Sequence, residues 1–166
     1  MPVYEDAGFQ LSQTASGSLT QMIPQTVDGA FRLSFTVSFL SPSGSGFTNG
    51  VSIDVRSGED PASDSYNAWR TFFLSRQGTY VVSQLINTTT YSLIQDHTAA
   101  PSFDPGFLAE NAVVLTGQDE TLTLTINGTD VTSLSHPVDG LTHELFWRIY
   151  RGTTVDVRSV VLEKFE

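Results

Sequence analysis

Cysteine is absent from the 166 residues, and basic residues are few. The lack of cysteine excludes a disulfide framework, a cysteine nucleophile and cysteine-based metal sites. Eight Lys and Arg against eighteen Asp and Glu give a formal charge of −10. That charge repels a phosphate backbone and an anionic membrane, and no basic stripe offsets it. We therefore expect neither nucleic acid nor a membrane among the partners.

Long apolar runs and an apolar leader are missing as well. No run approaches the roughly 18 residues that a membrane-spanning helix needs. The first residues, MPVYEDAGF, have neither the basic nor the apolar region of a signal peptide. Because predicted strands begin and end near both ends of the sequence, we expect residues 1–166 to be a single domain of a longer, extracellular or extracytoplasmic protein. A cytosolic protein is the alternative, and the oligomeric state stays open.

What the sequence does contain is alternation with a period of two. In AFRLSFTVSF the apolar residues Phe31, Leu33 and Phe35 alternate with polar ones, which is typical of a half-buried antiparallel strand. TLTLTINGTDVTSL repeats the pattern and turns at Asn127-Gly128, a type I′ hairpin signal. A change of phase near Ser159 predicts a β-bulge. Further strands are predicted over residues 8–13, 18–23, 68–75, 79–86, 91–95 and 112–115.

Many short strands separated by turns predict an all-β protein, a two-sheet antiparallel β-sandwich or jelly roll. The segment DHTAAPSFDPGFLAE, residues 96–110, is the least strand-like, and long ordered loops often carry function. The residues expected in the core come from the apolar phases of three strands: Phe31, Leu33, Phe35, Val37, Ile53, Val55, Leu122, Leu124 and Ile126.

The order of these segments resembles the concanavalin A-like lectin/glucanase superfamily, and most closely its laminin-G-like and "family 16 glycoside hydrolase-like" (DUF1080-type) jelly rolls. The similarity lies in the apolar strand FRLSFTVSF, the Ser/Gly-rich loop SPSGSGFTNG and the strand GVSIDVR, followed by GTYVVSQL, ETLTLTINGTDV and TTVDVRSVVLEKF. It covers about four-fifths of the chain. The resemblance implies a sandwich that binds saccharide on a concave sheet, often with calcium.

Glucanases of this superfamily carry carboxylates at alternate positions of one strand, because a nucleophile and an acid must flank the glycosidic bond. This sequence has no such run. Asp54 and Glu144 stand alone on their strands, and Asp119 and Glu120 are adjacent, so they point to opposite faces. We therefore predict no catalytic residues and no enzymatic activity.

Charged and aromatic side chains in phase on predicted strands are candidates for a ligand-binding face. Asp54 and Arg56 share one face of their strand, and the related families place an arginine where Arg56 stands. In LTHELFWRIY, one face carries Glu144, Phe146, Arg148 and Tyr150, a mixture that suits a sugar ring. A solvated sheet face held by cross-strand ion pairs is the competing interpretation.

Trp69 and Arg70 must point to opposite faces of their strand. We assign Arg70, together with Phe72, to the ligand-binding face, and Trp69 to the core. The predicted ligand-binding set is Asp54, Arg56, Arg70, Glu144, Phe146, Arg148 and Tyr150.

The spacing of residues predicts no transition-metal site. The three histidines are scattered, and His143-Glu144 lacks the second histidine of a zinc-protease motif, since Trp147 occupies that position. Calcium stays open because acidic residues recur in the predicted loops, although no calcium-loop pattern occurs. These residues are Glu59, Asp60, Asp64, Asp104 and Asp119.

The first hypothesis is a non-catalytic, lectin-like carbohydrate-binding module whose ligand is a saccharide or another hydroxyl-rich or anionic molecule. A structural or adhesion module that contacts protein is the second. The third is a divergent glycoside-acting enzyme, which two carboxylates within about 9.5 Å across a cleft would favour.

Overall fold

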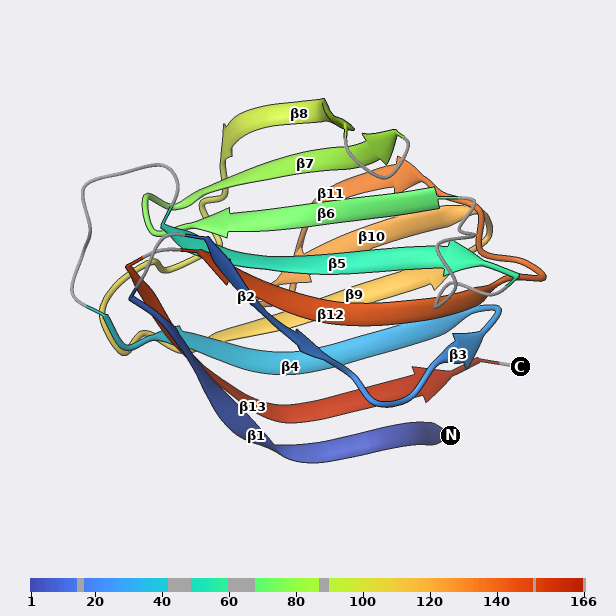
Figure 1. The fold of residues 1–166 in the computed structure, drawn as a ribbon, viewed down its shortest axis with the longest axis horizontal. Helices are drawn as coiled ribbons and strands as arrows, with labels where there is room; N and C mark the ends of the chain where they lie inside the picture. Colours follow the sequence, from blue (N-terminus) through green and yellow to red (C-terminus); the bar gives the residue numbers. More distant parts are fainter. Residues whose placement is uncertain (15–16, 42–48, 60–67, 87–89, 151, 166) are drawn as a thin grey trace.

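The fold is given by a computed structural model that describes residues 1–14, 17–41, 49–59, 68–86, 90–150 and 152–165. These residues form thirteen β-strands and no helix, so the described chain has no helix that could cross a membrane. All strand pairs within the sheets are antiparallel, as the period-two pattern predicts. The two sheets lie face to face as a sandwich, with the chain ends close together on β1 and β13 (Figure 1).

One sheet has six strands in the order β1-β13-β4-β9-β10-β11. Its strands are β1 (Pro2–Gln13), β13 (Thr153–Lys164), β4 (Phe31–Phe39), β9 (Asn111–Gln118), β10 (Thr121–Ile126) and β11 (Thr129–Ser135). The other sheet has the order β2-β12-β5-β6-β7-β8, and β3 also pairs with β12. These strands are β2 (Ser18–Met22), β3 (Val27–Asp28), β12 (Thr142–Tyr150), β5 (Gly50–Gly58), β6 (Ala68–Ser75), β7 (Thr79–Ile86) and β8 (Thr90–Ala99).

The core lies between the sheets and contains every residue that the alternation predicted. Phe35, the most exposed of that set, has only 3% of its surface accessible. The largest buried side chain is Trp147 of β12, which packs edge-on against Phe9 of β1 and Phe35 of β4. These aromatic contacts join the two sheets across the core.

Both local irregularities predicted from the sequence are confirmed. Asn127 and Gly128 have φ values of 50° and 79°, as a type I′ turn requires. Ser159 has a φ of 53° at a register shift between β13 and β4. The predicted loop over residues 96–110 is partly wrong, because β8 continues to Ala99 and only the remainder is irregular.

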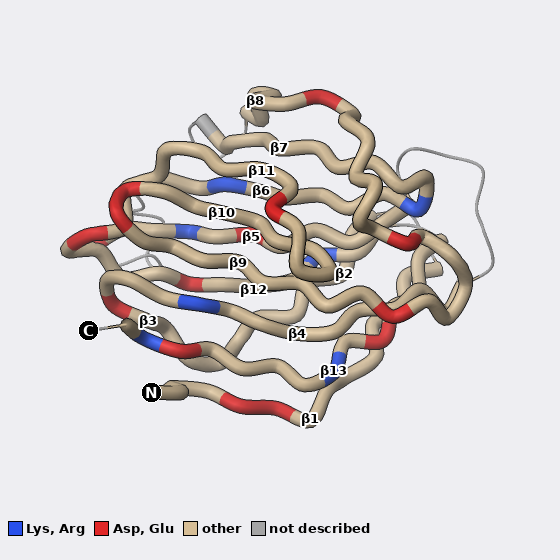
Figure 2. Tube along the Cα trace, turned by 180° about the vertical axis from the view of Figure 1, so that it is seen from behind, with Lys and Arg blue, Asp and Glu red and all other residues tan. Residues whose placement is uncertain are grey.

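Basic residues are scattered over several strands, and acidic residues lie mainly at strand ends and turns in the view from behind (Figure 2). Arg158 on β13 is paired with Asp156 at 2.5 Å and lies 4.0 Å from Glu110. Its side chain is 62% exposed, so this pair adds little to stability.

Candidate functional site

The candidate site lies on the outer face of the β2–β8 sheet, the face turned away from the other sheet. Ile53, Trp147 and Phe72 point into the core, so their neighbours in sequence point outward. The register places Asp54 of β5 between Phe146 of β12 and Thr71 of β6. The outward residues of these three strands form one continuous patch: Ser52, Asp54, Arg56, Trp69, Thr71, Phe73, Glu144, Phe146, Arg148 and Tyr150.

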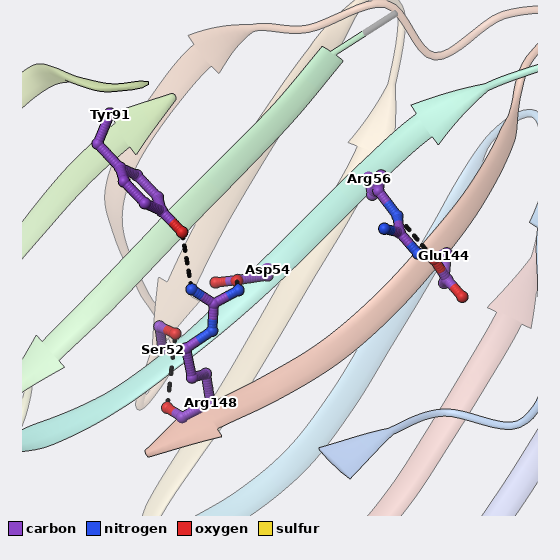
Figure 3. Close-up of polar contacts among 6 residues, drawn as sticks. All are labelled: Ser52, Asp54, Arg56, Tyr91, Glu144 and Arg148. Carbon is purple, nitrogen blue, oxygen red and sulfur yellow. Dashed lines mark hydrogen bonds and ion pairs between the residues drawn. The ribbon is translucent and has the colours of Figure 1, made fainter. Parts of the chain in front are cut away.

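This outer face is concave. The Arg148 Nη1 on β12 donates a hydrogen bond of 2.8 Å to the Tyr91 hydroxyl on β8 (Figure 3). Four strand spacings separate these strands, about 19 Å in a flat sheet. A tyrosine and an arginine cannot span that distance across a flat surface, so the sheet curves and brings β8 toward β12.

Two ion pairs hold the arginines of the outer face. Arg56 donates from Nε to Glu144 Oε2 at 2.8 Å, and its Nη2 contacts the same oxygen. Arg148 Nη2 lies 2.9 Å from Asp54 Oδ2. Both pairs run between the neighbouring strands β5 and β12, so each tightens this part of the sheet (Figure 3).

An aromatic pair lies between the two arginines. Trp69 and Phe146 meet edge to face with their ring centroids 5.6 Å apart. The guanidinium carbons of Arg56 and Arg148 lie 5.5 to 5.9 Å from the centroids of both rings. All four distances between a guanidinium carbon and a ring centroid fall within the range of cation–π attraction. A second aromatic pair, Phe73 and Tyr150, follows farther along the same strands.

Asp54 is the most unusual ionisable group on this face. It has no accessible surface, and desolvation raises its pKa to about 6. The charge of Arg148 opposes that rise, as do the side chains of Ser52, Thr71 and Trp69. The contact with Arg148 is a close ion pair, with Nη2 2.9 Å from Oδ2. The same burial, with the nearby charge of Asp54, raises the pKa of Tyr150.

Many side chains of the outer face are buried, and only some of them reach solvent. The side chains of Arg56 and Arg148 are 16% and 14% exposed, whereas Phe146 and Glu144 are buried. Tyr91 on β8 is half exposed. Hollows lined by described residues lie elsewhere, for example between residues 99–102 and 129–131. On the curved outer face, arginine, tryptophan and tyrosine groups therefore reach solvent.

Six of the seven predicted ligand-binding residues lie together on this face, and Arg70 does not. Arg70 lies opposite Val55 and Gln84, and Phe72 opposite Ile53, on the inward side. The assignment of Arg70 and Phe72 to the ligand-binding face was therefore wrong, as was the placement of Trp69 in the core. The sequence of this strand does not decide between its faces, because one face carries Trp69 and Phe73 and the other carries Arg70 and Phe72.

Two features of the site region escaped sequence reasoning. Tyr91 joins the face only because the sheet curves, which no local pattern reports. The second is a buried polar cluster on the inward side. Ser57 Oγ lies 2.6 Å from both His136 Nε2 and His143 Nδ1, and all three residues have no accessible surface. The cluster lies directly beneath the Arg56–Glu144 ion pair. In the register of β5 and β12, the backbone pair Ser57–His143 is the neighbour of the backbone pair Arg56–Glu144.

One arrangement of protons satisfies this cluster. His143 Nε2 lies 3.2 Å from the Val138 carbonyl, so it carries the proton and donates. His143 Nδ1 then accepts from the Ser57 hydroxyl, and Ser57 accepts from His136 Nε2. Both imidazoles are neutral, and burial lowers the pKa of each, that of His136 to about 3.

The candidate calcium ligands do not form a site among the residues described. Glu59 follows β5, Asp104 lies between β8 and β9, and Asp119 is in the β9–β10 turn. Asp60 and Asp64 are outside the described residues. No group of three metal-ligating side chains occurs in the described part of the chain. Calcium binding stays an untested expectation.

Comparisons with known proteins identify the fold. No family model and no curated protein sequence matches this chain. Among solved structures, the carbohydrate-binding module CBM66 from Bacillus subtilis superposes with a TM-score of 0.62 at 11% identity, over 97% of this chain and 94% of that one. The Emp46p carbohydrate recognition domain gives 0.62 at 11% identity, over 93% and 81%.

An enzyme also shares this fold. A β-fructofuranosidase from Schwanniomyces occidentalis gives a TM-score of 0.55 at 12% identity, over 96% of this chain but 35% of the enzyme. The chain thus has the concanavalin A-like jelly-roll fold predicted from its sequence. At these identities the comparisons establish the fold alone.

Proposed function

We propose that this chain is a non-catalytic, lectin-like carbohydrate-binding module of a larger extracytoplasmic protein, and that it binds saccharide on the outer face. The observation that carries the proposal is the aromatic pair Trp69–Phe146 flanked by two arginines on a concave sheet. A sugar ring offers apolar C–H faces to aromatic rings and hydroxyls to guanidinium and carboxylate groups. This surface offers both kinds of partner.

The geometry of the ion pairs supports a binding role. Arg56 and Arg148 are each fixed by a carboxylate from the neighbouring strand, so little side-chain entropy is lost when a ligand binds them. The fold adds support, since two proteins that share it are named for carbohydrate binding or recognition. Such modules work as parts of larger proteins, which is the context we propose here.

Trp69→Ala tests the proposal against a glycan array. We expect the native chain to bind a defined set of glycans and Trp69→Ala to lose that binding, because the exchange removes one ring of the aromatic pair. Phe107→Ala is the matched control: Phe107 is also an aromatic residue, 59% exposed, but lies in the loop that bridges to β4 of the other sheet. It should bind as the native chain does.

Arg148→Ala is a poorer test than Trp69→Ala. The substitution leaves Asp54 buried without its counter-charge, which destabilises a fold by about 3–5 kcal/mol. A loss of binding would then be confounded with a loss of structure. If the folded native chain binds no glycan at millimolar concentration, with and without calcium, the structural or adhesion module becomes the better proposal.

A second candidate function, a glycoside-acting enzyme, is favoured by one observation. Asp54 and Glu144 are diagonal neighbours across β5 and β12, which places their backbones about 7–8 Å apart, and Asp54 has the raised pKa of a general acid. Both carboxylates are buried and engaged by arginine, which leaves them poorly placed to reach a glycosidic bond. Hydrolysis of any glycan bound on the array, lost in Glu144→Gln, would establish the enzyme instead.

A further inference from the structure

Arg148 is held from two sides by residues of two different strands. Asp54 of β5 lies 2.9 Å from Nη2, and the Tyr91 hydroxyl of β8 accepts from Nη1 at 2.8 Å. A guanidinium has five N–H donors, so three remain for other partners. The Tyr91 hydroxyl has accepted one hydrogen bond and can donate its own proton outward. Arg148 and Tyr91 therefore form a clamp that joins β12 to β8 across the outer face (Figure 3).

The charge of the outer face depends on Asp54. Among the ten residues of the patch on β5, β6 and β12, the charged groups are Arg56, Glu144, Arg148 and Asp54, two cations and two anions in two pairs. With all four ionised the face is neutral, in a chain of charge −10. Protonation of Asp54 alone leaves Arg148 without a counter-charge while the Arg56–Glu144 pair persists. The face then carries one positive charge next to the aromatic pair.

We propose that Asp54 is a positioning residue that sets the charge of the ligand accepted by the Arg148–Tyr91 clamp. With Asp54 ionised, the clamp suits a neutral, hydroxyl-rich ligand. With Asp54 protonated, it favours an anionic one, such as a sugar carboxylate. The proposal rests on the proposed saccharide site, but its charge component can be tested without any sugar.

The surroundings of Asp54 make this protonation accessible near neutral pH. Its pKa is raised to about 6 by burial, against the opposing charge of Arg148. The other ionisable groups around it are Tyr150 of β12, whose pKa is raised by burial and by the charge of Asp54, and, through Arg148, the hydroxyl of Tyr91 on β8. On its own strand Arg56 is occupied by Glu144. From β6 the opposing residue is Thr71, whose buried hydroxyl can accept a hydrogen bond from the protonated carboxyl.

The experiment compares D-galactose with D-galacturonate, two sugars that differ by a carboxylate, and adds inorganic sulfate as a sugar-free anion. Binding is measured by NMR titration at about pH 5 and about pH 8, where galacturonate stays ionised. We expect the preference for galacturonate over galactose to rise about tenfold or more from the higher to the lower pH, the factor that corresponds to one pKa unit of coupling. Sulfate should perturb the Trp69 indole signal only at the lower pH.

Asp54→Asn should show the preference for the anion at both pH values, because Arg148 is then never neutralised. Asp119→Asn removes an exposed carboxylate from the β9–β10 turn of the other sheet and should behave as the native chain. A preference for the anion that changes with neither pH nor Asp54→Asn would overturn the proposal.

Two further measurements distinguish failure of this proposal from failure of the proposed function. If neither sugar binds but sulfate binds only at low pH, the saccharide function fails and the charge switch stands. To keep the test independent of the folding of Asp54→Asn, the ¹³C carboxyl shift of Asp54 is followed in the native chain. If the Asp54 carboxyl does not titrate between about pH 4.5 and 7.5, the proposal is wrong for every ligand.

Discussion

Leu124, in the middle of β10, shows how strongly a single core residue supports this fold. It is fully buried between the sheets, whereas Thr123 beside it faces solvent and bonds Ser133 across the hairpin at 2.9 Å. Leu124→Ala should lower the free energy of unfolding by about 2–5 kcal/mol, because it removes apolar contacts and leaves a cavity. Thr123→Ala should change it by only about 0.5 kcal/mol. Equal urea midpoints for the two variants would show that the faces of β10 are assigned wrongly.

Single residues also show what the alternation of apolar and polar side chains can and cannot predict. It separates the two faces of each strand correctly, so Arg56 and Asp54 share a face, as do Phe146 and Arg148. It does not say which face of β6 is the inner one, because Trp69 and Arg70 are both large and amphipathic. The register with β5 decides it, since Arg56 lies opposite Trp69. Pairing between strands is a long-range property that a single strand does not encode.

Strands β5 and β12 are joined at one end by the Ser57 cluster beneath the outer face. Ser57→Ala should remove two hydrogen bonds at once and leave a nitrogen of His136 and one of His143 unpaired in the core. We expect a loss of about 1–3 kcal/mol for each unpaired group. Ser75→Ala is the control: Ser75 is equally buried, but its hydroxyl accepts only one bond, from the Gln77 amide. Similar melting temperatures for the two variants would contradict the bridging role.

The strands predicted from the sequence gave no indication of the Ser57 cluster. His136 follows β11, His143 lies in β12 and Ser57 lies near the end of β5. No spacing in the sequence links these three residues. The sandwich brings them together because β5 and β12 are neighbours and the chain from β11 returns across the end of the core. Most strands were predictable along the chain, although β3 was not, whereas such contacts between distant segments require the topology.

For the whole molecule, buried ionisable groups make opposite contributions to the pH dependence of stability. Burial lowers the pKa of His136 from 6.5 to about 3 and that of His143 below 6.5. The unfolded chain then binds protons more readily than the native one, so stability is lost as the pH falls from about 6.5 toward 3. Asp54, with its pKa raised from 3.8 to about 6, acts the other way: the native chain takes up its proton first, and stability is gained between about pH 6 and 4.

The histidines should dominate, because the shift at His136 exceeds that at Asp54 and His143 adds to it. We therefore expect the free energy of unfolding, measured with urea, to be lower at about pH 4 than at about pH 7. His136→Gln keeps an N–H donor for Ser57 but does not titrate, so its decline should be smaller than the native one. Asp54→Asn loses the opposing contribution, so its decline should be steeper. The exposed carboxylates are common to all three chains and cancel in these differences. A native chain that is more stable at the lower pH, or a His136→Gln variant that declines as steeply as the native chain, would show that the buried imidazoles do not control the acid response.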